Sequence, residues 1–211
     1  MNYLAHAYLS FSEPSVLVGN LIADFVKGRQ IEKFSIGIQD GIRIHRQIDE
    51  FTDRHIVNRE VKGVFSEVVG RYNASFLDVV YDHFLAVNTV YEPIGGWAYF
   101  AESVYEEVDR VLPGLPERFQ RLFIYMKREN WLYNYRDIGL IQQSFERLSQ
   151  RALYLDNENK IFEVFVSNYQ LLADGFHAFF PDLVAYAESL QKANKLIDSG
   201  TDKRKVNGYK K

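Results

Sequence analysis

Residues 34–53 read FSIGIQDGIRIHRQIDEFTD, and their apolar positions are spaced for one amphipathic helix. Ile44, Ile48 and Phe51 recur every three or four residues, so they share one side of a helix with about 3.6 residues per turn. His45 and Asp49 are four residues apart and therefore project together from a neighbouring face. The segment predicts a packed helix with a second face that can carry chemistry.

The rest of the chain shows the same helical spacing. Only five prolines occur, and the expected stops are residues 92–96, 112–116 and 180–181. Further helices are expected over residues 13–26, 56–72, 75–88, 96–111, 117–129, 138–152, 157–179 and 182–197. No internal repeat or low-complexity linker divides the sequence. We therefore predict an all-α, compact multi-helix single domain over residues 1–198, followed by a basic, flexible tail over residues 199–211.

The composition is that of a folded globular protein. The 211 residues are 47% hydrophobic and 15% aromatic, which is enough to build a sizeable core. The lack of cysteine excludes disulfides, thiolate metal sites and a cysteine nucleophile, and it fits a reducing compartment. No apolar run approaches the ~20 residues of a membrane span, and residues 1–6 do not resemble a secretion signal. We expect a cytoplasmic protein with no membrane contact.

The charge distribution argues against a general nucleic-acid binder. The formal net charge is −3, and five basic residues and one acidic residue after Gly200 leave −7 for residues 1–200. Proteins that bind nucleic acid usually need a basic face to displace counterions from phosphates. We also find no Gly-rich phosphate loop, Gly-x-Ser-x-Gly elbow or dinucleotide fingerprint, so ATP use and acyl-serine chemistry lose support.

Histidines and aspartates cluster in the first part of the chain. Four of the five histidines lie within residues 1–83, and Asp24 and Asp82 stand among apolar neighbours, where an unpaired carboxylate would be costly. Each residue alone could be structural, since a helical histidine is often only a hydrogen-bonding group. Together they predict a His and carboxylate metal site, a ligand set that suits Mn, Fe, Zn or Mg. Arg46 lies beside this region and could hold a phosphate in two parallel hydrogen bonds, which favours a phosphoester substrate.

Several longer motifs occur in order along the chain. They are MNYLAH at 1–6, GNLIADFVKG at 19–28, GIRIHRQID at 41–49, DHFL at 82–85 and WLYNYRD at 131–137. Together they resemble the acyl carrier protein phosphodiesterases, also called acyl carrier protein hydrolases, which look like divergent relatives of the all-helical His-Asp metal phosphohydrolases. The resemblance implies a divalent ion, Mn or Mg, and hydrolysis of holo acyl carrier protein to apo acyl carrier protein and 4′-phosphopantetheine.

The resemblance also implies roles for particular residues. The expected metal ligands are His6, Asp24, His45, Asp82 and His83. Asp49 would be either a ligand or a partner that orients an imidazole, and Arg46 would hold the phosphate. The catalytic group is thus Asp24, His45, Arg46 and Asp49.

The substrate implied by the resemblance is itself a protein with an acidic recognition helix, so a basic rim is expected around the site. The candidates for substrate contact are Lys27, Arg29, Lys33, Arg43, Arg136 and Arg151. The sequence has Gln150 before Arg151, where the family pattern has two arginines, so a weaker contact with the carrier protein or the pantetheine phosphate is expected at this position. Two other functions stay open: hydrolysis of a nucleotide or other small phosphoester, and a non-enzymatic carrier-protein-binding module.

Overall fold

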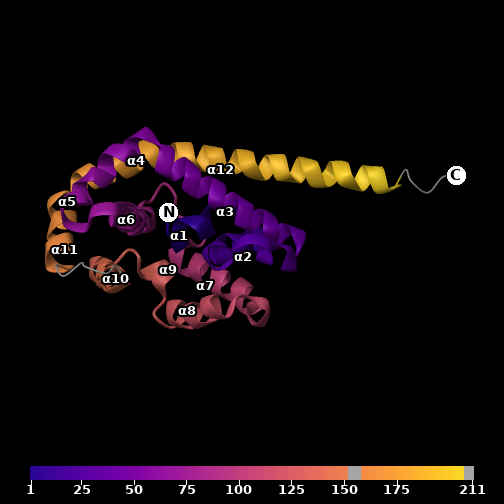
Figure 1. The fold of residues 1–211 in the computed structure, drawn as a ribbon, viewed down its shortest axis with the longest axis horizontal. Coiled ribbons are helices and arrows are strands. Elements are labelled where there is room, and N and C mark those ends of the chain that lie inside the picture. The colour runs from indigo at the N-terminus through magenta and orange to yellow at the C-terminus, as the bar shows by residue number, and fades with distance from the viewer. Residues whose placement is uncertain (152–157, 207–211) are drawn as a thin grey trace.

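The computed structural model describes the backbone of residues 1–151 and 158–206 and the side chains of residues 1–150 and 160–194. All regular structure in these ranges is helical, which confirms the predicted all-α class (Figure 1). The α-helices are α1 (Tyr3–Tyr8), α2 (Pro14–Ile22), α3 (Ile36–Arg54), α4 (Ile56–Val61), α5 (Ser66–Val69), α6 (Asn73–Val87), α7 (Gly96–Asp109), α8 (Glu117–Arg128), α9 (Trp131–Asn134), α10 (Ile138–Arg151), α11 (Glu158–Ser167) and α12 (Tyr169–Val206). Short 3₁₀ turns cover Ala23–Phe25, Gly28–Lys33, Lys62–Phe65, Gly70–Tyr72 and Leu112–Gly114.

Helices α2 and α3 cross in backbone contact at a pair of glycines. A Cβ atom added to Gly19 would lie 2.2 Å from the carbonyl oxygen of Ile38, and one added to Gly41 would lie 2.4 Å from that of Val16. No side chain larger than hydrogen fits at either position without moving a backbone. The crossing brings the end of α2, just before Asp24, beside the middle of α3.

Helix α6 runs through the core. Every residue from Phe76 to Ala86 except Asp78 is buried, which is expected of a helix that is covered on all sides. Its aromatic side chains pack against those of α10, α11 and α12, for example Phe76 against Phe145 and Tyr81 against Phe176. The polar residues of α6 therefore need partners inside the protein.

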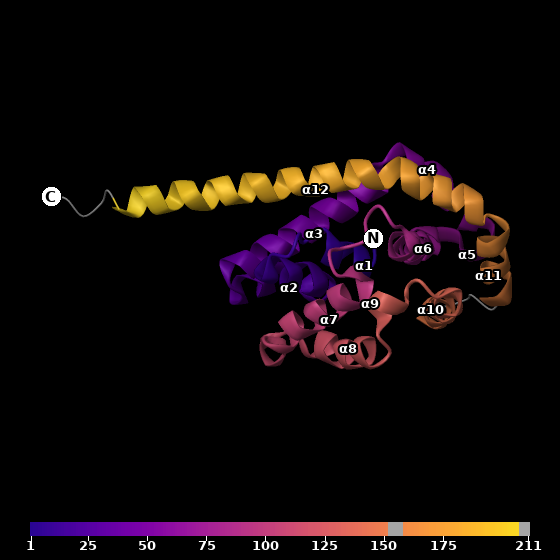
Figure 2. The ribbon, with the colours of Figure 1, turned by 180° about the vertical axis from the view of Figure 1, so that it is seen from behind.

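The expected break at residues 180–181 is wrong, because α12 continues through Pro181 to Val206. Proline inside a helix removes a backbone hydrogen bond and costs about 3 kcal/mol. Here Phe179, Phe180 and Leu183 are fully buried, and their packing offsets that cost. The chain breaks instead at Asn168, between α11 and α12. Figures 1 and 2 show α12 as a long helix that extends past the other elements, so the predicted boundary at residue 198 falls inside it.

Two further expectations differ from the structure. Residues 56–72 form α4, α5 and two 3₁₀ turns rather than one helix, and Gly70 has a φ of 55°, which an α-helix does not accept. Helices α1 and α9 and the turn Gly28–Lys33 were not predicted, because four to six residues are too few to show a hydrophobic period.

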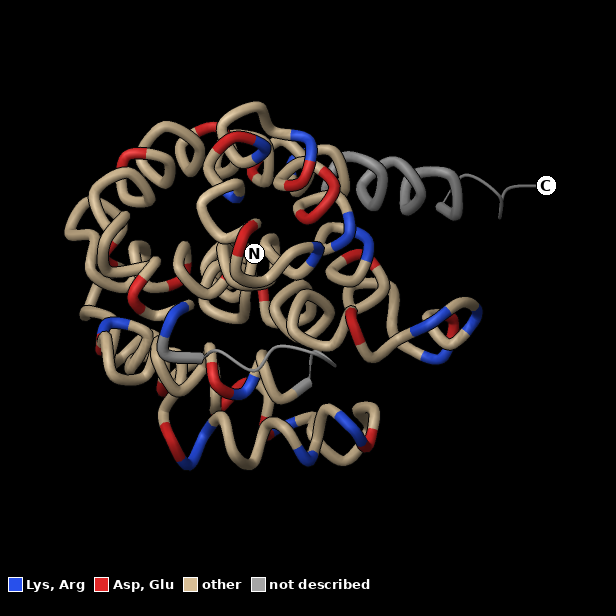
Figure 3. The backbone as a smooth tube through the Cα atoms, turned by 60° about the vertical axis from the view of Figure 1, so that its left-hand side comes forward, with Lys and Arg blue, Asp and Glu red and all other residues tan. Residues whose placement is uncertain are grey.

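The surface of the described residues carries charges of both signs. Figure 3 shows Lys and Arg interspersed with Asp and Glu along the tube, with no side in that view made of one sign alone. In the described part of the chain, we find no helix with the length and apolar character that a membrane crossing requires.

Candidate metal centre

Two histidines from different helices share one aspartate. Nε2 of His6, on α1, lies 3.1 Å from Oδ1 of Asp49, and Nε2 of His45 lies 3.1 Å from Oδ2 of the same carboxylate. The two imidazole rings stack with their centroids 3.9 Å apart. One possible ligand atom from each of the three residues lies within 4.8 Å of the others. Both histidines are buried, whereas the Asp49 side chain is partly open to solvent.

Asp24 adds a second carboxylate at the exposed edge of this group. It lies in the 3₁₀ turn that follows α2, and its Oδ1 is 3.5 Å from His45 Nε2. Its side chain is 72% exposed, so the centre is buried on the histidine side and open on the Asp24 side. Four predicted residues, His6, Asp24, His45 and Asp49, are thus brought together. We call these four residues the metal centre, because they are the candidates for holding a metal ion.

The polar atoms of this group suit a cation. Nε2 of His45 is buried next to two carboxylate oxygens, but neither is aligned for a hydrogen bond with it. Nδ1 of His6 and Nδ1 of His45 are also buried without a hydrogen-bond partner. Buried ring nitrogens without partners are costly, and a divalent ion bound by imidazole and carboxylate would engage one nitrogen of each ring.

The pKa values show how the protein balances these charges when no metal is bound. Burial would lower the pKa of His45, but the carboxylates of Asp24 and Asp49 outweigh it and raise the pKa to about 9. Burial and the neighbouring His45 lower the pKa of His6 to about 4. Burial opposes the charged form of Asp49, yet the Met1 ammonium and both histidines hold the pKa of that carboxyl far below its usual range. Without a metal ion, protonated His45 therefore neutralises part of the negative charge of Asp24 and Asp49.

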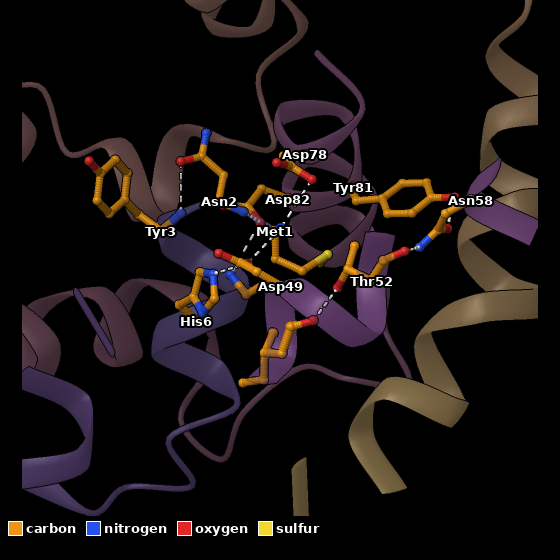
Figure 4. Close-up of polar contacts among 12 residues, drawn as sticks. Met1, Asn2, Tyr3, His6, Asp49, Thr52, Asn58, Asp78, Tyr81 and Asp82 are labelled. Carbon is orange, nitrogen blue, oxygen red and sulfur yellow. Dashed lines mark hydrogen bonds and ion pairs between the residues drawn. The ribbon is translucent and has the colours of Figure 1, made fainter. Parts of the chain in front are cut away.

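The α-ammonium group of Met1 lies between the carboxylates of Asp49 and Asp78 (Figure 4). Its nitrogen is 3.0 Å from Oδ1 of Asp78 and 3.5 Å from Oδ1 of Asp49. Burial would lower the pKa of this ammonium, but Asp78 and Asp49 raise it to about 11. Sequence reasoning missed Met1 and Asp78, since neither stands in a spacing typical of metal ligands or catalytic groups.

Asp82 lies outside the metal centre and holds α1 in place. It accepts hydrogen bonds from the backbone N–H groups of Asn2, Leu4 and Ala5 at 3.3, 2.7 and 3.2 Å. These are donors that the first turn of a helix leaves free, so Asp82 caps α1 from α6. Burial nevertheless raises the pKa of Asp82 to about 7. Through α1, Asp82 positions His6.

His83 points to a different part of the core. Its Nδ1 is 2.8 Å from the carbonyl oxygen of Tyr135, and its Nε2 is 2.9 Å from the hydroxyl of Tyr169. Adjacent residues on a helix project about 100° apart, so Asp82 and His83 cannot both face α1. The structure does not bring the predicted Asp82 and His83 ligands into the metal centre.

Two of the arginines predicted to contact the substrate, Arg46 and Arg43, bind groups of the protein itself. Arg46 donates from Nη2 to the carbonyl oxygen of Val26 at 2.9 Å and so ties α3 to the segment that follows Asp24. Arg43 is exposed and pairs with Asp40 one turn earlier.

Other predicted basic residues lie at the surface. Lys27, Arg29 and Lys33 are exposed in or beside the Gly28–Lys33 turn. Arg136 is exposed and donates to the hydroxyl of Tyr133. Arg151 is the last residue of α10, and its side chain lies outside the described residues.

Comparison with known proteins identifies the family. Residues 1–183 match the family described as acyl carrier protein phosphodiesterase. Proteins of that name from Enterobacter sp. (strain 638) and Photorhabdus laumondii are 33% and 32% identical to the chain; each alignment covers 90% of this chain, with 100% and 96% of the relative. The one from Salmonella agona is 34% identical over 89% of this chain and 97% of its own length. No solved structure matches the chain. The chain therefore belongs to the acyl carrier protein phosphodiesterase family.

Proposed function

We propose that the protein is a metal-dependent phosphodiesterase that hydrolyses holo acyl carrier protein to apo acyl carrier protein and 4′-phosphopantetheine. The observation that carries this proposal is the convergence of two buried histidines and two aspartates at 3.1 to 3.5 Å in a chain of this family. We propose His6, Asp24, His45 and Asp49 as the residues that hold a divalent ion, with Mn or Mg as the ion.

Such an ion would lower the pKa of water toward neutrality and neutralise charge on the phosphoryl oxygens. The protein's own contribution is geometric. One oxygen of Asp49 is hydrogen-bonded to Nε2 of His6 and the other lies 3.1 Å from Nε2 of His45, so this carboxylate lies against both rings. Asp24 stands at the open edge, where a phosphodiester can approach. Arg46 donates one N–H group to the carbonyl oxygen of Val26, and its other N–H groups would hold a phosphate.

The acyl carrier protein itself would bind at the exposed basic segment next to the centre. Lys27, Arg29 and Lys33 follow Asp24 within nine residues, and their exposure suits an acidic partner. Because the body of the chain is acidic overall, this local basic segment would set the orientation of such a partner. The absence of cysteine fits a cytoplasmic location for the reaction.

Mass spectrometry of holo acyl carrier protein incubated with the enzyme and either Mn or Mg tests the proposal. We expect a shift from the holo to the apo mass that a chelator abolishes. If the holo mass persists with each metal, this substrate is excluded. Hydrolysis of nucleotides in a parallel screen would then favour a small-phosphoester hydrolase, and tight complex formation without product would favour a non-enzymatic binding module.

A further inference from the structure

A cavity of about 240 Å³ opens beside the metal centre, between the start of the chain, α6 and α10. Asp24 lines it from the turn after α2, Ser75 and Asp78 line it from α6, and Ser144 and Arg147 line it from α10. We infer that this α6–α10 cavity binds the pantetheine arm of the substrate, an inference that rests on the proposed function.

The cavity and the metal centre share residues. Asp24 lines the cavity and also lies 3.5 Å from Nε2 of His45. Met1 lines it too, and its ammonium is 3.5 Å from Asp49 (Figure 4). A phosphodiester held at the metal centre therefore has the cavity next to it, and one ester substituent can continue into that space.

The charged groups of the cavity are already paired. Nη2 of Arg147 is 2.8 Å from Oε2 of Glu129, and its guanidinium lies 5.2 Å from the ring centroid of Trp131. Asp78 is paired with the Met1 ammonium. A ligand with further phosphate groups would meet no unpaired cation among the described residues that line the cavity. An uncharged ligand is favoured, because it does not have to compete with these pairs.

The uncharged residues of the cavity lining suit a flexible chain that carries amide groups. Ser75 and Ser144 supply hydroxyl groups, whereas Val79, Leu122 and Leu148 supply apolar contact. Pockets of this kind bind flexible, partly apolar ligands and orient them through a few polar groups. The pantetheine arm has amides and a hydroxyl along an aliphatic chain and carries no charge of its own. Lys27, Arg29 and Lys33 do not line the cavity, so the surface proposed for the carrier protein is separate from the site of its arm.

Calorimetric titration with pantetheine, which has no phosphate to be hydrolysed, tests the assignment. Ser144→Phe and Ser75→Phe each place a ring in the cavity, and Gln143→Phe on the exposed face of α10 is the matched control. We expect pantetheine binding to weaken at least tenfold in both cavity variants and to stay unchanged in the control. Metal content and thermal midpoint, measured for each variant, show that the metal centre and the fold are intact.

Each result bears on the inference separately from the proposed function. If wild-type protein does not bind pantetheine, or if both cavity variants bind it as well as wild type, the inference is overturned even when holo acyl carrier protein is hydrolysed. If wild-type protein binds AMP but not pantetheine, and both cavity variants lose AMP binding, the cavity is a nucleotide site and the inference is again overturned. If wild-type protein binds pantetheine and both cavity variants lose that binding, but wild-type protein does not hydrolyse holo acyl carrier protein, the cavity assignment is supported and the proposed reaction fails.

Discussion

Asp49 is the residue that turns two separate histidines into one site. Each of its oxygens lies 3.1 Å from an Nε2 atom, and the two imidazoles beside it form a stacked pair. Asp24 differs because it is exposed and contacts only the His45 side of the group. The group therefore has a buried part, the two histidines, and an exposed part, the Asp24 carboxylate, that is open to solvent.

Asp24→Asn is expected to reduce turnover of holo acyl carrier protein by at least about 100-fold, since the change removes a ligand charge at the open edge. Because Asp24 is exposed, the free energy of unfolding should change by no more than about 1 kcal/mol. Steady-state kinetics and urea denaturation measure the two effects. Asp53→Asn, which changes an exposed aspartate on α3, is the matched control. Full activity of Asp24→Asn would remove Asp24 from the site.

Metal affinity is expected to depend on pH through His45. Its pKa is raised from 6.5 to about 9, so in the metal-free protein it contributes stability that is complete below pH 6.5 and is lost as the pH rises through 9. A histidine must give up its extra proton before it can bind a metal ion, so the ion has to displace this proton. Calorimetric titration with Mn should show affinity rising by up to about tenfold per pH unit from 6.5 to 9 and levelling above that. A constant affinity over this interval would contradict the role of His45.

At the scale of elements, the α2–α3 crossing sets the distance between Asp24 and His45. Gly19 and Gly41 allow the backbones to touch, and His45 follows Gly41 by about one turn. Elsewhere α1 depends on the Asp82 cap for its place beside α3. The metal centre is therefore a product of two helix contacts rather than of one local motif.

Gly41→Ala is expected to lower the free energy of unfolding by about 1–3 kcal/mol, because the new methyl group would lie 2.4 Å from the backbone of Val16. The forced separation of α2 and α3 should also weaken metal binding. Gly63→Ala is the control, since no atom lies within 4 Å of an added Cβ there. Chemical denaturation and metal titration of both variants compare the effects. Equal stability of the two would show that the crossing tolerates a side chain.

Much of the helical structure around the metal centre was predictable from the sequence. The period of residues 34–53 predicts α3 and the shared face of His45 and Asp49, which the structure shows. Pairing of Asp82 with α1 was not predictable, because it depends on the start of the chain packing against α6. The continuation of α12 through Pro181 likewise depends on burial of Phe179 and Phe180, which local propensity does not reveal.

At the scale of the whole molecule, the metal centre comes from the first 49 residues, whereas later helices supply its surroundings. Helix α6 provides Asp78 and Asp82, and α10 provides one wall of the neighbouring cavity. The sequence motifs contain His6, Asp24, His45 and Asp49, which the structure brings together, and also some residues that line the cavity. The cavity itself was not predictable, because Ser75, Ser144 and Arg147 meet these residues only through packing between helices.

Recognition of the carrier protein is expected to depend on the exposed basic segment. The double variant Lys27→Glu with Arg29→Glu should raise KM for holo acyl carrier protein by about tenfold at low salt, and the difference should shrink as salt screens the charges. Arg118→Glu with Lys160→Glu, two exposed basic residues elsewhere, is the control. Kinetics at several salt concentrations measure the effect. Equal KM values for the two double variants would place the docking surface elsewhere.

The glycine contact between α2 and α3 also bears on which ionic radii the protein can accept. Two backbones already in contact cannot move closer around a small ion, and the stacked imidazoles leave little freedom on the buried side. In the proposed site, Asp24 is the most exposed of the four side chains, so adjustment to a larger or smaller ion would fall mainly on its carboxylate. For an ion held as proposed above, selectivity would therefore depend on how far the exposed Asp24 carboxylate can adjust against the buried pair of imidazoles.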